Sequence, residues 1–355
     1  MNISNQKKLK ALDLFSGVGG LSYGFEKAGF EIVGAIEFDK IIAESMKKNH
    51  NKTEIFVGDI RRINAKDVKE KIGKVDIILG GPPCQGFSLK GQRRGFDDQR
   101  NFLFKEYVKY IKFFKPSYFV MENVPAILSE QGGYFKDQIL KKFADMGYNV
   151  NFGILNSSDF GVPQNRRRAV FLGSLNSKIS LPKSTINKAV SVWEAISDLA
   201  YLDSGEGKFE SEYAKKSESK FQDLMRSNSK KLYNHVATKH SEIALDRLKR
   251  IPPEKGKEFL TEKISSTFGQ TWGRLEKNKP SPTIVTRFDT PSNGKNSHPF
   301  LHRAITPREA ARIQSFPDTF VFYGNKTSIA KQIGNAVPPL LGKAIAEHIL
   351  RDIKK

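Results

Sequence analysis

Short apolar runs alternate with amphipathic segments through the first half of the chain. Segments such as residues 40–49 and 103–114 carry apolar side chains at the spacing of a helix that buries one face. The apolar runs are rich in β-branched residues and predict buried strands at residues 10–15, 31–37, 55–57, 75–79 and 118–121. This alternation predicts an α/β fold with a largely parallel sheet and helices on both faces, ending in an antiparallel pair at 150–155 and 169–172.

From about residue 181 the chain loses this regular alternation. Two polar, charged segments, 205–220 and 225–231, have no clear period and are interpreted as loops. Beyond them, a strand is predicted at 282–286, and helices are predicted at 307–315 and at the C-terminus, up to Ile353. The second half is therefore expected to be smaller and less regular than the first.

Composition limits the class of protein. The 355 residues are 38% hydrophobic, which is enough for a sizeable core, and no apolar run approaches membrane-spanning length. The first ten residues are polar and contain lysines, unlike a signal peptide. The single cysteine cannot form an internal disulfide, and no cysteines and histidines stand at metal-ligand spacing. We therefore expect a cytoplasmic protein with no membrane association and no metal.

The charge indicates a class of partner. The chain has 59 lysines and arginines against 38 aspartates and glutamates, a net charge of +21. Residues 1–180 carry 29 basic and 19 acidic side chains and residues 181–325 carry 24 and 17, so the excess is not a tail. A distributed positive charge favours nucleic acid as a partner, although a lysine-rich composition inherited from an AT-rich genome produces the same excess.

The only cysteine, Cys84, lies in a loop of glycines and prolines. Residues 80–88 read Gly-Gly-Pro-Pro-Cys-Gln-Gly-Phe-Ser. Prolines restrict the backbone before the thiol, and small residues leave room for a flat substrate. Because the apolar run 75–79 precedes the loop, the thiol is expected at the carboxyl end of a strand, where open α/β sheets bind ligands. This position favours a nucleophile over a small buried core cysteine.

A second loop, Gly17-Val18-Gly19-Gly20, follows the first predicted strand. It lets a ligand approach the backbone at a helix N-terminus, but Ser22 stands where a dinucleotide fingerprint has its third glycine. Glu37 ends the second strand, where a carboxylate can accept both hydroxyls of a ribose. Asp59 ends the third strand, where it can accept an adenine amine. Since the glycine loop has no basic residue, an adenosyl ligand without phosphates fits better than a dinucleotide.

Taken in order, these segments resemble the C5-cytosine DNA methyltransferases of bacterial restriction–modification systems. The resemblance spans nearly the whole chain; only about residues 180–273 are unmatched, and there the target-recognition region of the family varies. The matching segments are 13–20, 81–88, Glu122-Asn123-Val124, Gln164-Asn165-Arg166-Arg167-Arg168, 274–287 with 306–317, and 334–339.

The resemblance implies a Rossmann-like, S-adenosylmethionine-dependent methyltransferase domain with a smaller, irregular target-recognition domain. Residues 1–180 are expected to form the catalytic and cofactor-binding domain, 181–325 the target-recognition domain, and 326–355 a C-terminal segment that returns to the catalytic domain. The implied contacts with the cofactor S-adenosyl-L-methionine are Phe15, Gly17, Gly19, Gly20, Leu21, Glu37, Phe38, Asp59, Ile60, Pro83, Leu103, Asn335 and Val337.

The implied reaction transfers a methyl group to C5 of a cytosine. Addition of the Cys84 thiolate to C6 turns C5 into an enamine-like carbon that can take the methyl group of a sulfonium. By the same resemblance Glu122 contacts N3 and the exocyclic amine, Arg168 binds O2, and Arg166 holds the catalytic loop or a phosphate. The base that removes the C5 proton is not assigned.

The implied substrate is duplex DNA, in which the target base must be flipped out of the stack. The glycine-rich, basic segment 85–100 is interpreted as a lid that closes over DNA. The implied DNA contacts are Ser88, Arg93, Arg94, Arg100 and Arg287. We expect a monomer that shares its recognition site with a restriction endonuclease without forming a stable complex; the recognition sequence cannot be inferred.

Two alternatives stay open at this stage. One is a transfer-RNA cytosine-C5 methyltransferase on the same fold, against which the long unmatched region argues. The other is a DNA-binding regulator that has lost catalysis, against which intact Cys84, Glu122 and Arg168 argue. A thiol-redox function is excluded more firmly, because no resolving cysteine exists.

Overall fold

The computed structural model describes residues 8–83, 102–262, 264 and 269–354. The chain forms two compact units. The first contains residues 1–156, 167–184 and 341–355, and the second contains 157–166 and 185–340. These boundaries differ from those drawn on the sequence in three places: residues 157–166 and 326–340 belong to the second unit, and residues 181–184 belong to the first.

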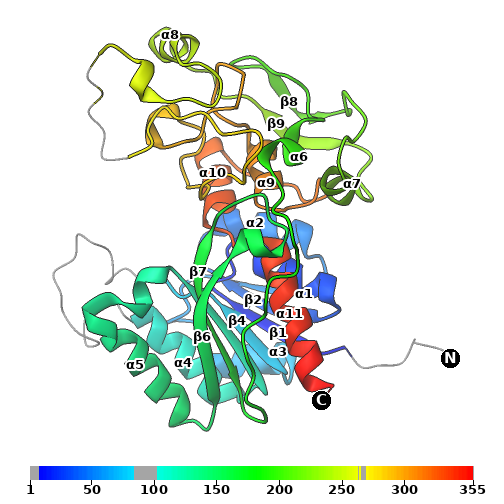
Figure 1. Cartoon of the computed structure of the whole chain (residues 1–355). Helices are drawn as coiled ribbons and strands as arrows, with labels where there is room; N and C mark the ends of the chain where they lie inside the picture. The colour runs from blue at the N-terminus through cyan, green and yellow to red at the C-terminus, as the bar shows by residue number, and fades with distance from the viewer. Residues whose placement is uncertain (1–7, 84–101, 263, 265–268, 355) are drawn as a thin grey trace. The chain divides into compact units, whose positions relative to one another are not determined.

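The first unit is built on a seven-stranded sheet with the order β3-β2-β1-β4-β5-β7-β6 (Figure 1). β1 to β5 are parallel, and β7 runs antiparallel to both of its neighbours. This confirms the predicted α/β class and the final antiparallel pair. The strands are β1 (Lys10–Leu14), β2 (Glu31–Glu37), β3 (Glu54–Val57), β4 (Ile77–Gly80), β5 (Tyr118–Asn123), β6 (Asn149–Asn156) and β7 (Arg167–Ser174).

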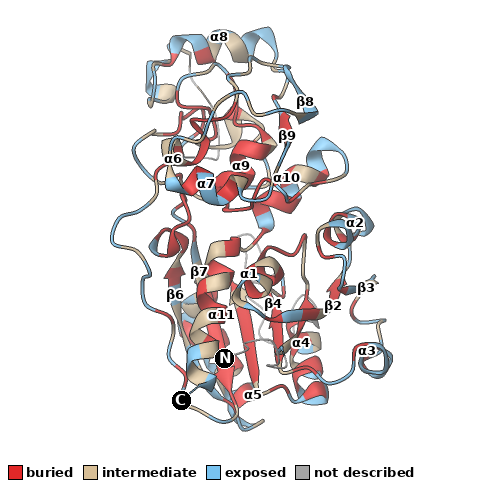
Figure 2. Ribbon diagram, turned by 90° about the vertical axis from the view of Figure 1, so that its right-hand side faces the viewer, coloured by how far each residue is buried: buried red, intermediate tan, exposed pale blue. Residues whose placement is uncertain are grey.

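Helices cover both faces of this sheet, as Figures 1 and 2 show. One face carries α1 and α11, and the other carries α3, α4 and α5, whose apolar side chains enter one core. The short helix α3 was not predicted, because lysines and acidic residues leave it only two large apolar side chains. The helices are α1 (Gly20–Ala28), α2 (Lys40–Asn49), α3 (Ala65–Ile72), α4 (Phe102–Phe114), α5 (Tyr134–Ala144) and α11 (Pro339–Ile353).

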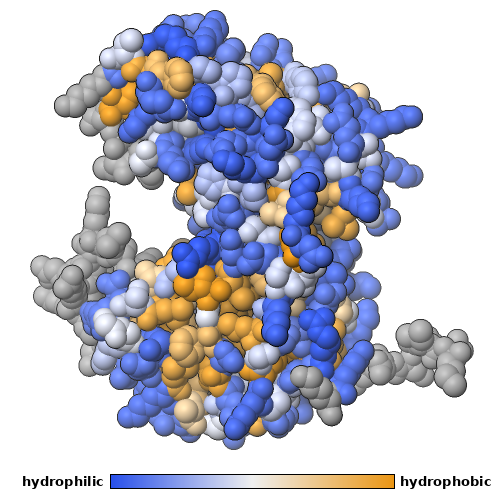
Figure 3. Space-filling view, viewed as in Figure 1, coloured by the Kyte–Doolittle hydropathy of each residue, from blue (hydrophilic) through white to orange (hydrophobic). Residues whose placement is uncertain are grey.

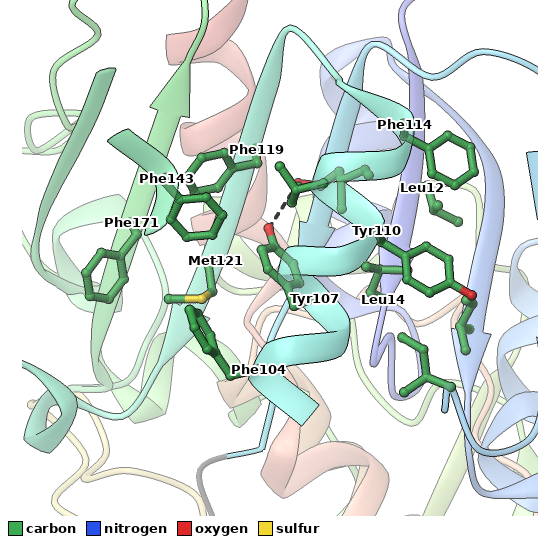
Figure 4. Packing of buried hydrophobic residues seen from close by; sticks show 14 of the residues in the cluster. Leu12, Leu14, Phe104, Tyr107, Tyr110, Phe114, Phe119, Met121, Phe143 and Phe171 are labelled. Carbon is green, nitrogen blue, oxygen red and sulfur yellow. Dashed lines mark hydrogen bonds between the residues drawn. The ribbon is translucent and has the colours of Figure 1, made fainter. Parts of the chain in front are cut away.

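Aromatic side chains fill the core between α4, α5 and the central strands (Figure 4). The rings of Phe119 on β5 and Phe143 on α5 have centroids 4.1 Å apart. Tyr107 is fully buried, and its hydroxyl donates to the carbonyl of Val120 at 2.9 Å, which satisfies its polar atom. A Cβ on Gly173 would lie 2.0 Å from the Phe119 ring, so β7 needs glycine there. This packing holds the strands rigidly behind the edge that carries the candidate site.

The second unit is less regular and has one two-stranded sheet among its described residues, β8 (Gly207–Ser211) with β9 (Leu232–Val236). The loop prediction for 205–220 and 225–231 is therefore wrong in part, since β8 and the first residue of α7 fall within the first segment and the last residues of α7 within the second. The helices of this unit are α6 (Val192–Ile196), α7 (Lys220–Arg226), α8 (Glu242–Arg250), α9 (Pro307–Ile313) and α10 (Lys326–Asn335).

The strand predicted at 282–286 is not present. Pro280 and Pro282 cannot donate backbone hydrogen bonds, and the only ladder contact in this segment is an isolated bridge between Ser281 and Gln164. The peptide groups of Ile284 are instead bonded by the buried side chains of Gln164 and Arg166. Of residues 282–286 only Ile284 is buried, and side chains take the place of a partner strand for its backbone.

Buried arginines organise the centre of the second unit, which Figure 2 shows as a buried region around α9. Arg303, Arg308 and Arg312 each have no exposed surface. Arg312 is bonded to the carboxylates of Asp198 and Asp318, and Arg303 pairs with Glu309 at 2.7 Å. Buried charges of this kind are stable only when every partner is present.

Within the described part of the chain, none of the helices combines the length and the apolar character needed to cross a membrane.

Candidate active site

The carboxyl ends of five parallel strands lie along one edge of the sheet in the first unit. Because the spatial order is β3, β2, β1, β4, β5, the groups at the carboxyl ends of these strands stand in the same order along the edge. They are Asp59, Glu37, the glycine loop 16–20, the proline loop that begins at 80–83, and Glu122. The strand topology thus brings together the acidic and glycine-rich segments that the sequence singled out.

Glu37 fixes the glycine loop. Its Oε2 accepts the N–H of Gly17 at 2.9 Å, and its Oε1 accepts the N–H of Asp39 at 2.8 Å. Burial raises the pKa of Glu37 above its ordinary value, while the hydrogen bonds from Asp39 and Gly17 oppose the rise. A carboxylate has about four acceptor positions, so both oxygens can accept further hydroxyl donors.

Asp59 follows β3 and is engaged by its neighbour in the chain. The Arg61 side chain approaches both carboxylate oxygens, with its Nε 2.9 Å from each and its Nη2 against Oδ2. The hydrogen bond from Arg61 is the main cause that lowers the pKa of Asp59, which keeps the group ionised. An anionic acceptor is therefore present at the end of β3, and Arg61 holds its orientation.

The described start of the proline loop is fixed beside Glu122. A Cβ on Gly81 would lie 3.1 Å from Glu122 Oε2, so the backbone passes close to the carboxylate. Asn123 Nδ2 donates to the carbonyl of Pro82 at 3.0 Å. This role of Asn123 was not predicted from the sequence, although its place directly after Glu122 at the end of a buried strand was a usable signal.

Glu122 and Arg168 form an ion pair across β5 and β7. Arg168 Nε lies 2.6 Å from Glu122 Oε1, and both side chains are largely buried, with 15% and 13% exposure. Two residues from one sheet edge therefore present a carboxylate and a guanidinium side by side. Together they can bind a flat polar ring that offers both a donor and an acceptor.

Arg166 lies in the second unit and is only 1% exposed. Its guanidinium donates to the carbonyls of Ile284 at 3.1 Å and Gly334 at 2.9 Å. Gln164 accepts the N–H of Ile284 at 2.8 Å and donates to Gln314 at 2.8 Å, so this segment is held by side chains on both sides. Of the two roles predicted for Arg166, contact with a phosphate does not fit a side chain without exposed surface, and holding the catalytic loop stays a prediction.

The other residues predicted for the cofactor in the first unit differ in exposure. Phe38, at the end of β2, is 73% exposed, whereas Leu21 and Ile60 are buried in the core and can shape the site only from within. Phe15 adopts a left-handed backbone at φ 59, which turns the chain into the glycine loop. The remaining four are Gly19, which is the N-cap of α1, Gly20, which begins α1, Leu103, which is half-buried on α4, and Pro83, which is exposed.

Besides Arg166, three predicted site residues belong to the second unit. Asn335 is exposed at the end of α10, Val337 is half-buried, and Arg287 is 60% exposed and lies 3.8 Å from Asp289. The predicted contacts of Asn335 and Val337 with the cofactor, and of Arg287 with DNA, stay predictions.

Cys84, Ser88, Arg93, Arg94 and Arg100 lie outside the described residues. Among the residues that are described, no three histidine, cysteine, aspartate or glutamate side chains are grouped so as to hold a metal ion.

Comparisons with known proteins identify a single family. The chain matches the family described as C-5 cytosine-specific DNA methylase over residues 9–351. It is 40% identical to the type II methyltransferase M.DdeI of Desulfomicrobium norvegicum, over 96% of this chain and 88% of that protein. It is 35% identical to the type II methyltransferase M.NgoPII of Neisseria gonorrhoeae, over 98% and 97%.

A solved structure is similar over its whole length. It is described as a DNA modification methyltransferase encoded within a prophage of E. coli. The match covers 98% of this chain and 100% of that chain, with a TM-score of 0.81 and 27% sequence identity.

Proposed function

Because this chain belongs to the C-5 cytosine-specific DNA methylase family, we propose that it methylates C5 of one cytosine in a specific duplex DNA sequence. We further propose that it is the modification enzyme of a type II restriction–modification system, as the relatives named type II methyltransferases suggest. The observation that carries the chemistry is the Glu122–Arg168 pair beside the loop that leads to Cys84.

In the proposed reaction the protein acts on the ring from two sides. The Cys84 thiolate adds to C6 and forms a carbon–sulfur bond, while Glu122 shares a proton with N3 and Arg168 donates to O2. These two contacts accommodate the electron density that the attack pushes into the ring. After methylation, loss of the C5 proton to a base returns the electron pair to the ring and expels the thiolate. The base stays unassigned.

S-adenosylmethionine fits the groups at the glycine loop. The Gly17 position is open, since a Cβ there would meet no atom within 4 Å. Glu37 would accept the ribose hydroxyls, Asp59 the adenine amine, and the exposed ring of Phe38 would stack on the adenine. The cofactor, when bound, supplies an electrophilic methyl group and leaves as a neutral thioether.

Duplex DNA fits the charge of the chain. The net charge of +21 is spread over the sequence, and Figure 3 shows a mainly hydrophilic surface on the visible face of the second unit. Lysine and arginine contacts with phosphates would offset the few kcal/mol that flipping a base out of the stack costs. We infer a monomer that acts on bacterial DNA in the cytoplasm and that forms no stable complex with its endonuclease.

Bisulfite sequencing tests the proposed function directly. Purified protein is incubated with unmethylated plasmid and S-adenosylmethionine, and protection is expected at one cytosine within a single recurring sequence. A parallel competition between duplex DNA and transfer RNA separates the two substrate classes. Methyl transfer to transfer RNA alone, or no transfer at all with intact cofactor, would contradict the proposal.

Glu122→Gln tests the proton-sharing role. The amide keeps the shape of the side chain but cannot share a proton with N3, so kcat is expected to fall by about 10²- to 10⁴-fold with little change in the KM of the cofactor. Single-turnover methylation measures the chemical step. Glu70→Gln, at an exposed position on α3, is the matched control and is expected to behave as wild type. A variant with normal kcat would exclude the role.

A further inference from the structure

A buried polar cluster lies beneath the glycine loop, and the chemistry proposed above does not use it. Asp13, near the end of β1, is 1% exposed and stands between Ala35 on β2 and Leu79 on β4. Its Oδ2 accepts the hydroxyl of Ser22 at 2.6 Å. Ser22 is fully buried in the first turn of α1, the helix that the glycine loop begins. A central carboxylate is therefore bonded directly to the helix beneath the ligand loop.

His50 supports the same loop from α2. It is 2% exposed, and its Nδ1 lies 3.0 Å from Glu26 Oε2 on α1. A Cβ on Gly19 would lie 2.5 Å from His50 Nε2, so the ring lies directly against the loop backbone. Gly19 is also the N-cap of α1 and has φ 87, which disfavours any other residue there. The loop thus rests on the imidazole as well as on the Asp13–Ser22 pair.

Burial and the groups facing Asp13 place the pKa of its carboxyl near neutral pH. Burial raises its pKa to about 7, the Ser22 hydrogen bond and the proximity of His50 lower it, and the carboxylate of Glu37 raises it. Tyr107 on α4 also faces Asp13, but its hydroxyl donates to the carbonyl of Val120. Asp13 is therefore a group of this cluster whose protonation can change near neutral pH.

We propose that Asp13 and His50 are positioning residues of the cofactor loop, and that binding of the sulfonium form of the cofactor is coupled to release of a proton from Asp13 to the solvent. This inference rests on the proposed function. A positive charge at the loop stabilises the ionised carboxylate through a poorly screened interior, whereas the neutral thioether product does not. The coupling would make the site bind the methyl donor more tightly than the product as the pH rises.

Calorimetric titration of the full chain with S-adenosylmethionine and with S-adenosylhomocysteine tests the coupling. The two ligands share adenosine and the amino-acid part and differ in the methyl group and its charge. Between about pH 5.5 and 6.5, where an α-amino group is still almost fully protonated, affinity for the sulfonium is expected to rise about threefold. The thioether is expected to change less than about twofold, and only the sulfonium should release a proton, seen as a buffer-dependent heat.

Asp13→Asn is the diagnostic variant. The amide oxygen can still accept from Ser22, but the side chain cannot ionise, so the pH dependence and the proton release seen with S-adenosylmethionine should both disappear. Asp137→Asn, at an exposed position on α5, is the matched control and should retain both. His50→Gln should weaken both ligands, because it loosens the loop. It should also move the rise in affinity for S-adenosylmethionine to higher pH, because it removes a group that lowers the pKa of Asp13.

The outcomes are distinct. Equal pH dependence for the two ligands in the wild type, or a dependence that persists in Asp13→Asn, overturns the inference and leaves the proposed function intact. Failure of both ligands to bind the wild type overturns the proposed function itself. If Asp13→Asn does not fold, the wild-type comparison of the two ligands still decides.

Discussion

Replacing Cys84 with alanine is expected to lower the rate of methyl transfer by about 10⁴-fold or more, because the chain has no other thiol to form the bond to C6. Affinity for S-adenosylmethionine and for duplex DNA is expected to stay close to that of the wild type, since neither depends on the thiolate. Transfer of a labelled methyl group to DNA measures the first effect, and calorimetry and gel retardation measure the second.

The covalent step can be seen separately from turnover. A duplex with 5-fluorocytosine at the target position cannot lose its C5 substituent as a proton, so the wild type should remain bonded to it on a denaturing gel. Cys84→Ala should give no such band. Because Cys84 is the only cysteine, labelling with a thiol reagent should block the adduct at one reagent per chain. Near-normal turnover in Cys84→Ala, or an adduct in that variant, would exclude the covalent mechanism.

The residues that meet at the carboxyl edge of the sheet were predicted well from the sequence, for a physical reason. In a parallel sheet every strand ends at the same edge, so residues placed at strand ends by local pattern alone must come together in space. Glu37 and Asp59 were found in this way, and the carboxylate of Glu37 proves to be bonded to the glycine loop. The matches with C-5 cytosine-specific DNA methylases confirm the family that these residues suggested.

The contacts that fix this edge could not be predicted, because they are made between distant segments. Asn123 bonds to Pro82, and Gln164 and Arg166 bond to the two peptide groups of Ile284. Local periodicity carries no information on which carbonyl a buried side chain will reach. The same limit explains the false strand at 282–286, where the local pattern does not show which groups satisfy the backbone.

The second unit was predicted poorly because its interior is partly polar. Sequence patterns identify a core by its apolar residues, but here arginines and carboxylates occupy fully buried positions. Arg308, for example, is fully buried and bonds to the carbonyls of Tyr233, Pro317 and Phe320. From the sequence alone such residues are indistinguishable from a basic surface. Part of the positive charge attributed to nucleic-acid binding is therefore internal.

Removing one carboxylate from this interior should destabilise the second unit strongly. Asp318 accepts two hydrogen bonds from Arg312, at 2.9 and 2.7 Å, and one from the hydroxyl of Tyr213 at 2.8 Å. Asp318→Ala leaves Arg312 buried with half of its counter-charge gone, and we expect the free energy of unfolding to fall by about 3–5 kcal/mol. Asp246→Ala, which breaks an exposed pair on α8, is the control and should be close to wild type.

Tryptophan fluorescence during urea unfolding measures this effect selectively, because the only two tryptophans, Trp193 and Trp272, both lie in the second unit.

The same fluorescence signal should show the pH at which the second unit unfolds in acid. Burial favours the neutral form of Asp318, but Arg312 and Arg308 outweigh it and hold its pKa below the ordinary value; Arg303 brings the pKa of Glu309 to about 2 against its own burial. Carboxylates whose pKa is lowered by folding stabilise the unit above about pH 4, and this contribution is lost as the pH falls toward 2. Wild type should therefore lose its native fluorescence in that range. Asp318→Ala should have a lower free energy of unfolding already at neutral pH, and that free energy should fall less steeply as the pH is lowered. A variant as stable as wild type would mean that the Arg312 charge is balanced without Asp318.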